Sequence, residues 1–190
     1  MVNVYCLKVD KKYNRKFVTN LKNAVNKYLT VEHKFYCMTD EPEKDYDIPI
    51  VRKFPDVWNK LHFFNYVGNS LYFDLDIEIH DNIDFLADDF EDFTVVDSRR
   101  WKKQKEDLGF KVSNNTFVNS SIMRWSFAQH IYQKFANNCD TYLRLYKGID
   151  RFIYNENIAY KYFNTDKIMS WKEKDYTKKV ITLYNGRYKN

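Results

Sequence analysis

The sequence has few of the residues that usually interrupt regular structure. Only 4 of its 190 residues are glycine and 3 are proline. Glycine and proline mark turns and flexible linkers, so their scarcity argues against a linker between domains. We therefore expect a single domain over residues 1–190, a length at which a sizeable core can be buried.

Cysteines and long apolar runs are also scarce. The three cysteines, Cys6, Cys37 and Cys139, are widely dispersed, which excludes a disulfide framework or a metal knuckle and predicts buried free thiols. No apolar stretch reaches membrane-spanning length, and residues 1–10 lack the basic flank and apolar run of a signal peptide. The expected location is therefore the cytoplasm, or the host cytoplasm if the protein is viral.

Aromatic side chains and positive charge are abundant instead. The chain has 16 Tyr, 15 Phe and a net charge of +5, and codon bias in an AT-rich genome accounts for the aromatic load. The charge is compatible with nucleic acid, an acidic surface or a phosphorylated ligand. Apart from a basic cluster at 99–105, however, the basic residues are interrupted by acidic ones, and no basic and aromatic alternation indicates RNA binding. Single-stranded nucleic-acid binding stays as an alternative, but we expect no nucleic-acid partner.

The spacing of apolar residues predicts strands that alternate with helices. Strands are expected at 2–7, 35–38, 48–51, 70–73, 93–96 and 180–184, and helices at 17–28, 58–67 and 127–146. The segment 117–125 is expected to begin as a strand and turn into a helix. Alternation of this kind predicts an α/β sandwich with a mixed, mostly parallel central sheet, in which ligands gather at the carboxyl ends of strands.

Two aspartates follow directly on one of these strands. Asp74 and Asp76 come after the apolar run Leu71–Phe73, two residues apart. In an extended strand, side chains two apart leave the same face, so both carboxylates can converge on one hard cation. Mg²⁺ keeps water ligands and takes phosphate oxygens, so two carboxylates suffice when the ligand is a diphosphate. Short acidic repeats are common on surfaces, and it is the position at a strand end that favours a metal site.

Several motifs appear in the order known from one enzyme family. Trp58-Asn59-Lys60 precedes Asp74-Leu75-Asp76, and these resemble the Trp-x-Lys and Asp-x-Asp motifs of small bacterial and viral, phage-type glycosyltransferases with the GT-A fold. Val2–Lys8 with Tyr13 resembles the opening nucleotide-binding strand and loop of that family. Phe35–Asp40 and Asn119–Trp125 resemble two further family segments. The resemblance extends over nearly the whole chain and implies a GT-A (Rossmann-like) fold.

The resemblance implies roles for individual residues. Asp76 is expected to ligate Mn²⁺ or Mg²⁺, and Asp74 to touch ribose or metal-bound water. The other implied donor-site residues are Leu7, Lys8 and Tyr13 at the base, Asp40 at the base or ribose, Lys60 at the diphosphate, Asn119 at a sugar hydroxyl, and Arg187 and Lys189 closing over the diphosphate. For Lys60 a solvated surface position is equally expected, and an asparagine such as Asn119 is just as readily a helix N-cap.

The chain also departs from the family pattern. Asp10-Lys11-Lys12 stands where the opening loop usually has glycine before its tyrosine. Asn185 replaces the histidine that often completes the metal site, and its amide oxygen is a weaker ligand for which water can substitute. Asp150, in an altered acidic element, is a candidate for acceptor binding or general base, with Asp97 and Glu156 behind it. The four histidines, His33, His62, His80 and His130, have no metal-ligand spacing.

Together these features predict a metal-dependent glycosyltransferase. It would move a hexose from a nucleotide diphosphate sugar, with UDP favoured and GDP possible, to an unknown acceptor. The missing histidine and the short chain leave an alternative open, in which the protein is a nucleotide-sugar hydrolase or a non-catalytic sugar-nucleotide binder.

Overall fold

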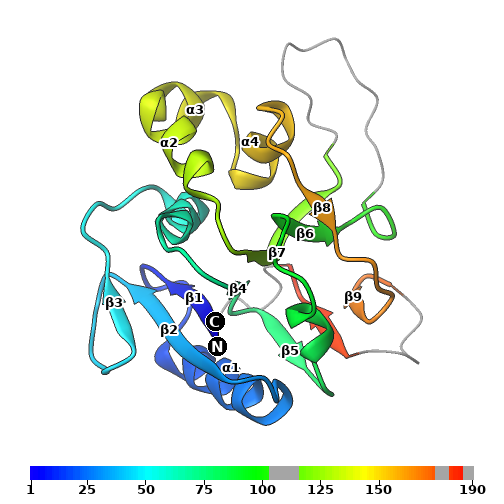
Figure 1. Cartoon of the computed structure of the whole chain (residues 1–190). Helices are drawn as coiled ribbons and strands as arrows, with labels where there is room; N and C mark the ends of the chain where they lie inside the picture. Colours follow the sequence, from blue (N-terminus) through cyan, green and yellow to red (C-terminus); the bar gives the residue numbers. More distant parts are fainter. Residues whose placement is uncertain (103–115, 174–179, 186–190) are drawn as a thin grey trace.

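A mixed sheet of seven strands forms the centre of the computed structural model, which describes residues 1–102, 116–173 and 180–185 (Figure 1). The strand order is β3-β2-β1-β4-β7-β6-β8. Their bounds are β1 Val2–Lys8, β2 His33–Thr39, β3 Asp47–Pro49, β4 Ser70–Phe73, β6 Thr94–Asp97, β7 Val118–Trp125 and β8 Lys161–Tyr162. β3, β2, β1 and β4 are parallel, β7 is antiparallel to both β4 and β6, and β8 is parallel to β6. The predicted mixed, mostly parallel sheet is confirmed.

Helices cover both faces of this sheet. In Figure 1 the helix α1 (Arg15–Tyr28) lies below the sheet, and α2 (Gln129–Asn137), α3 (Cys139–Leu145) and α4 (Ile149–Asn155) lie above it. The side chains of β1 alternate accordingly: Val4 and Cys6 pack in the core with α1, whereas Tyr5 and Leu7 pack in the core with α2–α4. Among the helices of the described residues, none has the length and apolarity needed to cross a membrane.

A second, smaller sheet lies beside the α1 core. Its order is β5-β10-β9, with bounds β5 Ile77–Ile79, β9 Ile168–Ser170 and β10 Ile181–Leu183. β10 pairs antiparallel with β5 and parallel with β9, and the isoleucines of all three strands join the same core as α1. The chain therefore leaves the large sheet after β4 and enters the small sheet at β5, so that residues 74–76 link the two.

Two helical segments differ from simple α-helix. The predicted helix at 58–67 is a 3₁₀ helix, η1 (Asp56–Asn65), which lies on the α2 side of the sheet; a shorter 3₁₀ helix, η2, spans Asp84–Ala87. The helical region predicted at 127–146 is divided between α2 and α3. The predicted strands at 2–7, 35–38 and 70–73 are confirmed, as is the helix at 17–28, and all three cysteines are free and buried as expected.

The prediction for 117–125 is wrong, because β7 is a strand throughout. Every residue of β7 is buried, so its sequence lacks the alternation of polar and apolar residues that marks a half-exposed strand. The strand is also irregular: Val95 of β6 lies opposite Met123, but Val96 lies opposite Asn119. The residues between them bulge away from β6, and the backbone N–H of Asp74 donates to the carbonyl of Ser121 (2.8 Å).

Candidate functional site

A cavity of about 220 Å³ lies where β1 and β4 end. We call it the carboxylate cavity. Its lining brings together six residues that the sequence analysis assigned to a donor or metal site, and these are Leu7, Tyr13, Lys60, Asp74, Asp76 and Asn185. The other lining residues are Val9, Lys12, Asp56, Val57, Tyr72 and Leu75. The carboxyl ends of parallel strands are where α/β sheets bind their ligands.

Lys60 is buried inside this site. Helix η1 leaves Lys60 only 4% exposed, so the solvated surface position that was equally expected is wrong. Its Nζ lies 2.7 Å from Asp74 Oδ1 and donates to the Ser120 carbonyl at 3.1 Å. The same ammonium lies 5.0 Å from the centre of the Tyr72 ring. Because of the bulge in β7, Ser120 is not paired with β6, and its carbonyl accepts a hydrogen bond from Lys60 instead.

The two aspartates are held by a turn and not by an extended strand. Leu75 and Asp76 form a turn between β4 and β5, so the strand geometry expected for them is wrong, although both carboxylates line one cavity. Asp74 Oδ1 accepts from the Tyr72 hydroxyl (2.7 Å) as well as from Lys60. Asp76 is 6% exposed, and its backbone carbonyl accepts from the Tyr184 N–H at 3.0 Å.

The tyrosines of the site stay protonated. Burial raises the pKa of Tyr13, and the charges of Asp76 and Asp74 and a hydrogen bond with Asp76 raise it further. Burial likewise raises the pKa of Tyr72, assisted by the charge of Asp74. Both phenols are therefore neutral donors at physiological pH. The formal charges of the lining then come from three aspartates and two lysines, an excess of one negative charge that suits a bound cation.

Asn185 completes the lining from the far end of the described chain. It has a left-handed backbone with φ 52°, which asparagine tolerates better than most residues, and its Nδ2 donates to Ser170 Oγ (2.9 Å). Pairing of β10 with β5 brings this segment back to the aspartates. Within the described ranges, no group of three His, Cys, Asp or Glu could hold a metal ion. A cation would therefore depend on Asp74, Asp76, the Asn185 amide oxygen and oxygens of water or ligand.

Asp40 belongs to a separate cluster at the ends of β1 and β2. Lys53 Nζ donates to Asp40 Oδ2 (2.6 Å) and to Asp10 Oδ1 (2.5 Å), and the Asp10 N–H donates to Asp40 Oδ2 (3.2 Å). Burial raises the pKa of Asp40, but these hydrogen bonds outweigh burial and lower it overall. Asp40 Oδ1 is buried and has no hydrogen-bond partner among the described residues. Asp10, in the loop that lacks the family glycine, has the left-handed φ of 55° that glycine would favour.

Besides Asp40, three further predicted residues do not line the carboxylate cavity. Lys8 Nζ pairs with Glu41 at 3.0 Å. Asn119 lies within β7 and its Oδ1 accepts from the Ser121 N–H (3.1 Å), so the N-cap alternative is wrong. Asp150 Oδ1 accepts from the Ser120 N–H (3.0 Å), and Lys102 Nζ lies 3.8 Å from its Oδ2. Asp150 is thus linked to Lys60 through Ser120.

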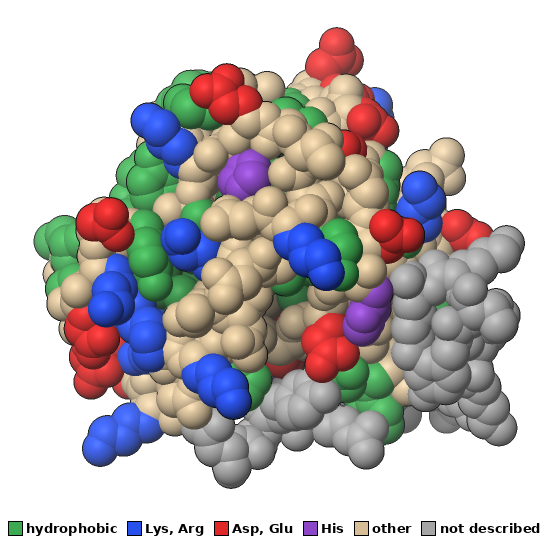
Figure 2. Space-filling model, turned by 90° about the horizontal axis from the view of Figure 1, so that it is seen from below, with side chains coloured by type: hydrophobic (Ala, Val, Ile, Leu, Met, Phe, Trp, Pro, Cys, Tyr) green, Lys and Arg blue, Asp and Glu red, His purple; other side chains and the backbone are tan. Residues whose placement is uncertain are grey.

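The remaining predicted groups lie elsewhere. Asp97 pairs with Arg99, and Glu156 accepts from the hydroxyls of Tyr146 and Tyr142. Arg187 and Lys189 lie outside the described residues, as does much of the basic cluster at 99–105. On the face seen in Figure 2, Lys and Arg side chains are scattered with Asp and Glu side chains among them. The described part of that face therefore has mixed charge, as the sequence indicated.

Sequence reasoning missed Tyr72, Ser120 and Lys53. Tyr72 was within reach, because it precedes Asp74 by two residues and strand alternation suggests a shared face. Ser120 acts through its backbone carbonyl, and Lys53 reaches Asp40 from a different segment of the chain. Neither contact leaves a signal in the local sequence.

Comparisons with known proteins support the fold. The sequence matches no protein-family model and no curated protein. Two solved structures of the galactosyltransferase LgtC, one in complex with donor and acceptor sugar analogs and one an active-site mutant, superpose with TM-scores of 0.65 and 0.67. Each is 12% identical over 98% of this chain and 88% of its own. The glycosyltransferase GlyE of Streptococcus pneumoniae TIGR4 gives a TM-score of 0.63 at 13% identity, over 85% of this chain and 45% of its own. At these identities the likeness shows a GT-A-like fold.

Proposed function

We propose that the protein is a metal-dependent glycosyltransferase that transfers a hexose from a UDP-sugar to an acceptor hydroxyl. One observation carries the proposal: buried Lys60 and the carboxylates of Asp74 and Asp76 share a cavity at the carboxyl edge of a GT-A-like sheet. The neighbours of known structure are named as glycosyltransferases, and one was solved with donor and acceptor sugar analogs.

The residues present fit a hard divalent cation such as Mn²⁺ or Mg²⁺. Asp74 Oδ1 already accepts from Lys60 and Tyr72, so we assign Asp74 to ribose or metal-bound water and Asp76 to direct ligation. The Asn185 amide oxygen, which also belongs to the lining, is proposed as a further ligand. When bound, the cation neutralises charge on the leaving diphosphate.

Lys60 is proposed to stabilise the negative charge on the leaving diphosphate together with the cation. In the transfer, the acceptor oxygen bonds to the anomeric carbon while the bond from that carbon to the diphosphate oxygen breaks. The electron pair leaves with the nucleotide diphosphate, and the hydroxyl proton is released to solvent. A buried ammonium fixed by Ser120 and Asp74 needs little reorganisation to stabilise the developing negative charge. Arg187 and Lys189 are proposed to assist at the diphosphate.

Asp150 is proposed to hold the backbone of Ser120, the residue whose carbonyl accepts from Lys60. Its carboxylate accepts from the Ser120 N–H and so supports the strand that carries the Lys60 contact. Its assignment as acceptor ligand or general base rests on the resemblance alone. Lys8 and Asn119, which do not line the cavity, are assigned to the donor on the same ground.

Base recognition is proposed for the neighbouring cluster around Asp40. Its unpartnered Oδ1 is a buried acceptor that an N–H of a nucleobase can satisfy. Uracil offers one such N–H at its Watson–Crick edge and guanine offers more, so a UDP donor is favoured by the resemblance while GDP fits the same acceptor. Leu7 and Tyr13, which line the carboxylate cavity, are proposed to border the base.

The specific observation that favours a hydrolase or a non-catalytic binder is Asn185, a weaker ligand than histidine. One experiment separates these functions from transfer. The protein is incubated with UDP-hexoses or GDP-hexoses, Mn²⁺ and a panel of saccharides, and glycoside, free sugar and nucleotide are quantified by chromatography. We expect a new glycoside in amounts equal to the released nucleotide diphosphate. Free sugar without glycoside would favour the hydrolase, and no turnover of any donor would contradict the enzyme assignment.

A further inference from the structure

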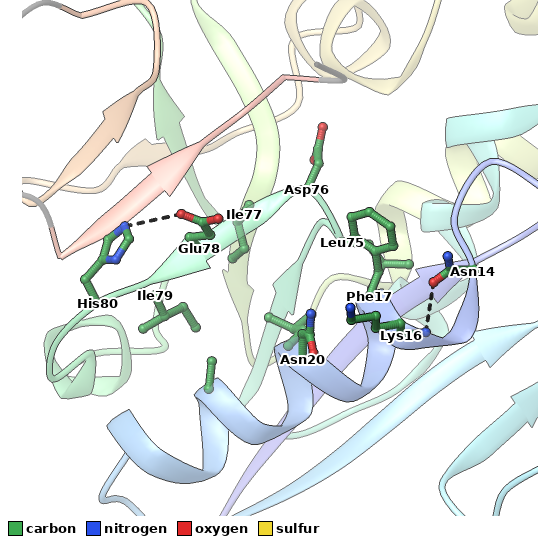
Figure 3. Close-up of a pocket in the computed structure, with 12 residues that line it drawn as sticks. Asn14, Lys16, Phe17, Asn20, Leu75, Asp76, Ile77, Glu78, Ile79 and His80 are labelled. Carbon is green, nitrogen blue, oxygen red and sulfur yellow. Dashed lines mark hydrogen bonds and ion pairs between the residues drawn. The ribbon is translucent and has the colours of Figure 1, made fainter. Parts of the chain in front are cut away.

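A second cavity, of about 580 Å³, lies between α1 and the segment that contains β5 (Figure 3). We call it the α1–β5 groove. One wall is formed by residues 75–80, and the other by Asn14, Lys16, Phe17, Asn20, Leu21 and Ala24. Residues 75–80 are consecutive, whereas a strand that turned one face to the groove would contribute only every second residue. β5 therefore presents its edge to the groove.

That edge of β5 is unpaired within the described residues. β5 is the outer strand of the small sheet, and β10 binds its other edge. There the Asp76 carbonyl accepts from the Tyr184 N–H (3.0 Å), and the His80 N–H donates to the carbonyl that precedes β10 (2.8 Å). In an antiparallel pair, such residues alternate with residues whose N–H and C=O point away from the partner strand. The alternating residues are Ile77 and Ile79, so two N–H groups and two carbonyls lie at the open edge.

The α1 wall offers apolar surface beside these backbone groups. The buried side chains of α1 pack in the same core as the isoleucines of β5. Next to this buried stripe, Phe17 and Ala24 are half-buried and Asn20 is exposed, and all three line the groove. A strand added at the open edge would lie over these three residues, and its side chains on that face would contact Phe17 and Ala24.

The charge of the groove is unbalanced at one end. Figure 3 shows Lys16 at the end where β5 begins and His80 at the opposite end. Glu78 accepts from the Tyr184 hydroxyl (2.8 Å), and the Asp76 carboxylate points away from α1 in Figure 3. Lys16 is exposed and forms no ion pair with a described residue. An acidic group on a ligand would therefore complement Lys16.

A second copy of the chain suits this edge poorly. Its own β5 is flanked by its own α1. The symmetric antiparallel register that uses all four free backbone groups also sets Glu78 opposite the same residue of the other copy. Like charges directly opposite each other destabilise a strand pair. A single extended segment without a flanking helix meets neither obstacle.

We propose that the α1–β5 groove binds an extended peptide segment of a partner protein, which adds to the small sheet as a strand beside β5. The segment runs antiparallel to β5 and hydrogen-bonds to the backbone of Ile77 and Ile79. Its residues opposite these isoleucines share their face and are apolar, and its carboxyl end carries an acidic residue beside Lys16. The interaction needs neither donor nor metal, so it is independent of the proposed function.

The probe is the peptide acetyl-Thr-Val-Thr-Val-Thr-Val-Asp-amide, titrated into the ¹⁵N-labelled full chain. Two modified peptides test the backbone contacts. N-methylation of the valines removes the N–H groups that would donate to β5, whereas N-methylation of the threonines puts the same methyl groups on the outer edge. Chemical shifts and amide hydrogen exchange are followed residue by residue, with His80 as the internal control because its N–H is already bonded.

Three variants test the two walls. Asn20→Trp fills the groove from the α1 wall, and Asn23→Trp places the same bulk at an exposed position of α1 that lines neither cavity. Lys16→Met removes the charge that the acidic residue of the peptide would meet. Circular dichroism checks that each variant is folded.

We expect the unmodified peptide and the N-methyl-threonine peptide to slow exchange of the Ile77 and Ile79 N–H groups by about tenfold at ten times Kd, with His80 unchanged. The N-methyl-valine peptide and the Asn20→Trp variant should abolish the effect, Lys16→Met should weaken binding a few-fold, and Asn23→Trp should resemble the wild type. Absence of any change at Ile77 and Ile79 with millimolar peptide would overturn the inference. Equal binding of the N-methyl-valine peptide, or equal binding by folded Asn20→Trp, would overturn it as well.

Discussion

The two cavities that meet at Asp76 are built in different ways. The carboxylate cavity combines charged side chains from the loop after β1, from η1 and from the segment after β4 with the Asn185 amide and two phenols whose pKa values are raised. A second cavity of about 580 Å³, the α1–β5 groove, is lined by residues of α1 and by residues 75–80, and it combines a single helix with a single strand over an apolar floor. A charged site at strand ends can be read from motifs, whereas a groove made of ordinary surface residues can be found only once the chain is folded.

The largest effect is expected for Asp76→Asn, because Asp76 belongs to both cavities. Replacing a charged metal ligand with a neutral one weakens the cation site and removes charge compensation from the transition state. We expect kcat/KM to fall by roughly 100-fold or more. Transfer assays at limiting Mn²⁺ measure the loss, and circular dichroism should show an intact fold.

Asp45→Asn is the matched control, since Asp45 is exposed and lines neither cavity. It should keep full activity. Near-normal transfer by Asp76→Asn at limiting Mn²⁺ would mean that the two aspartates are only an acidic turn.

A smaller effect is expected for Lys60→Met, which changes only the carboxylate cavity. The variant leaves the Asp74 carboxylate without the Lys60 ammonium. Because Asp74 is partly exposed, we expect the free energy of unfolding to fall by about 2 kcal/mol, which is less than for a fully buried ion pair. Donor KM should rise and kcat fall, with acceptor KM unchanged. Urea unfolding and two-substrate kinetics measure these changes.

The double variant Lys60→Met with Asp74→Asn tests the cause. It should be more stable than the sum of the single losses predicts, because it removes both members of the pair. Lys44→Met, at an exposed position, is the control for loss of a lysine. Additive losses would contradict coupling between Lys60 and Asp74.

The smallest effect is expected for Asp40→Asn, in the separate cluster that Asp40 forms with Asp10 and Lys53. The pKa of Asp40 is lowered in the folded state, so its ion pair with Lys53 contributes stability above the unfolded pKa near 3.9, and this contribution is lost as the pH falls through the folded pKa. Asp40→Asn should lower Tm slightly at pH 7 and converge with the wild type at strongly acidic pH. The affinity for UDP relative to GDP should also change. Parallel Tm curves at every pH would contradict the electrostatic cause.

The fold was largely predictable because its signals are local. The strand at 2–7, the helix at 17–28 and the motif order all depend on neighbouring residues, and the ends of parallel strands necessarily meet at one edge. The small sheet was not predictable, because β5 must pair with β10 about a hundred residues away. The β7 segment was misread because burial on both faces removed its alternation.

The site was predictable only in part, for the same reason. Asp74, Asp76 and Lys60 carry motif signals, and the structure brings them into one lining. Packing between distant segments determines the turn that holds the aspartates, the Lys53 contacts of Asp40 and the groove between α1 and β5. The resemblance assigned Asn119 to a sugar hydroxyl and Asp150 to the acceptor or the general base; in the structure both accept hydrogen bonds from the β7 backbone, and neither lines the carboxylate cavity.

The most direct test of the account is a thermal-shift screen of UDP-sugars and GDP-sugars with and without Mn²⁺ or Mg²⁺, run on the wild type and on Asp76→Asn. Ligands that bind only the folded state raise Tm. The account predicts that a nucleotide-sugar stabilises the wild type only when the metal is present, and that Asp76→Asn loses this stabilisation. Stabilisation that is equal without metal, or no response to any nucleotide-sugar with either metal, would contradict a metal-and-diphosphate site at Asp74 and Asp76.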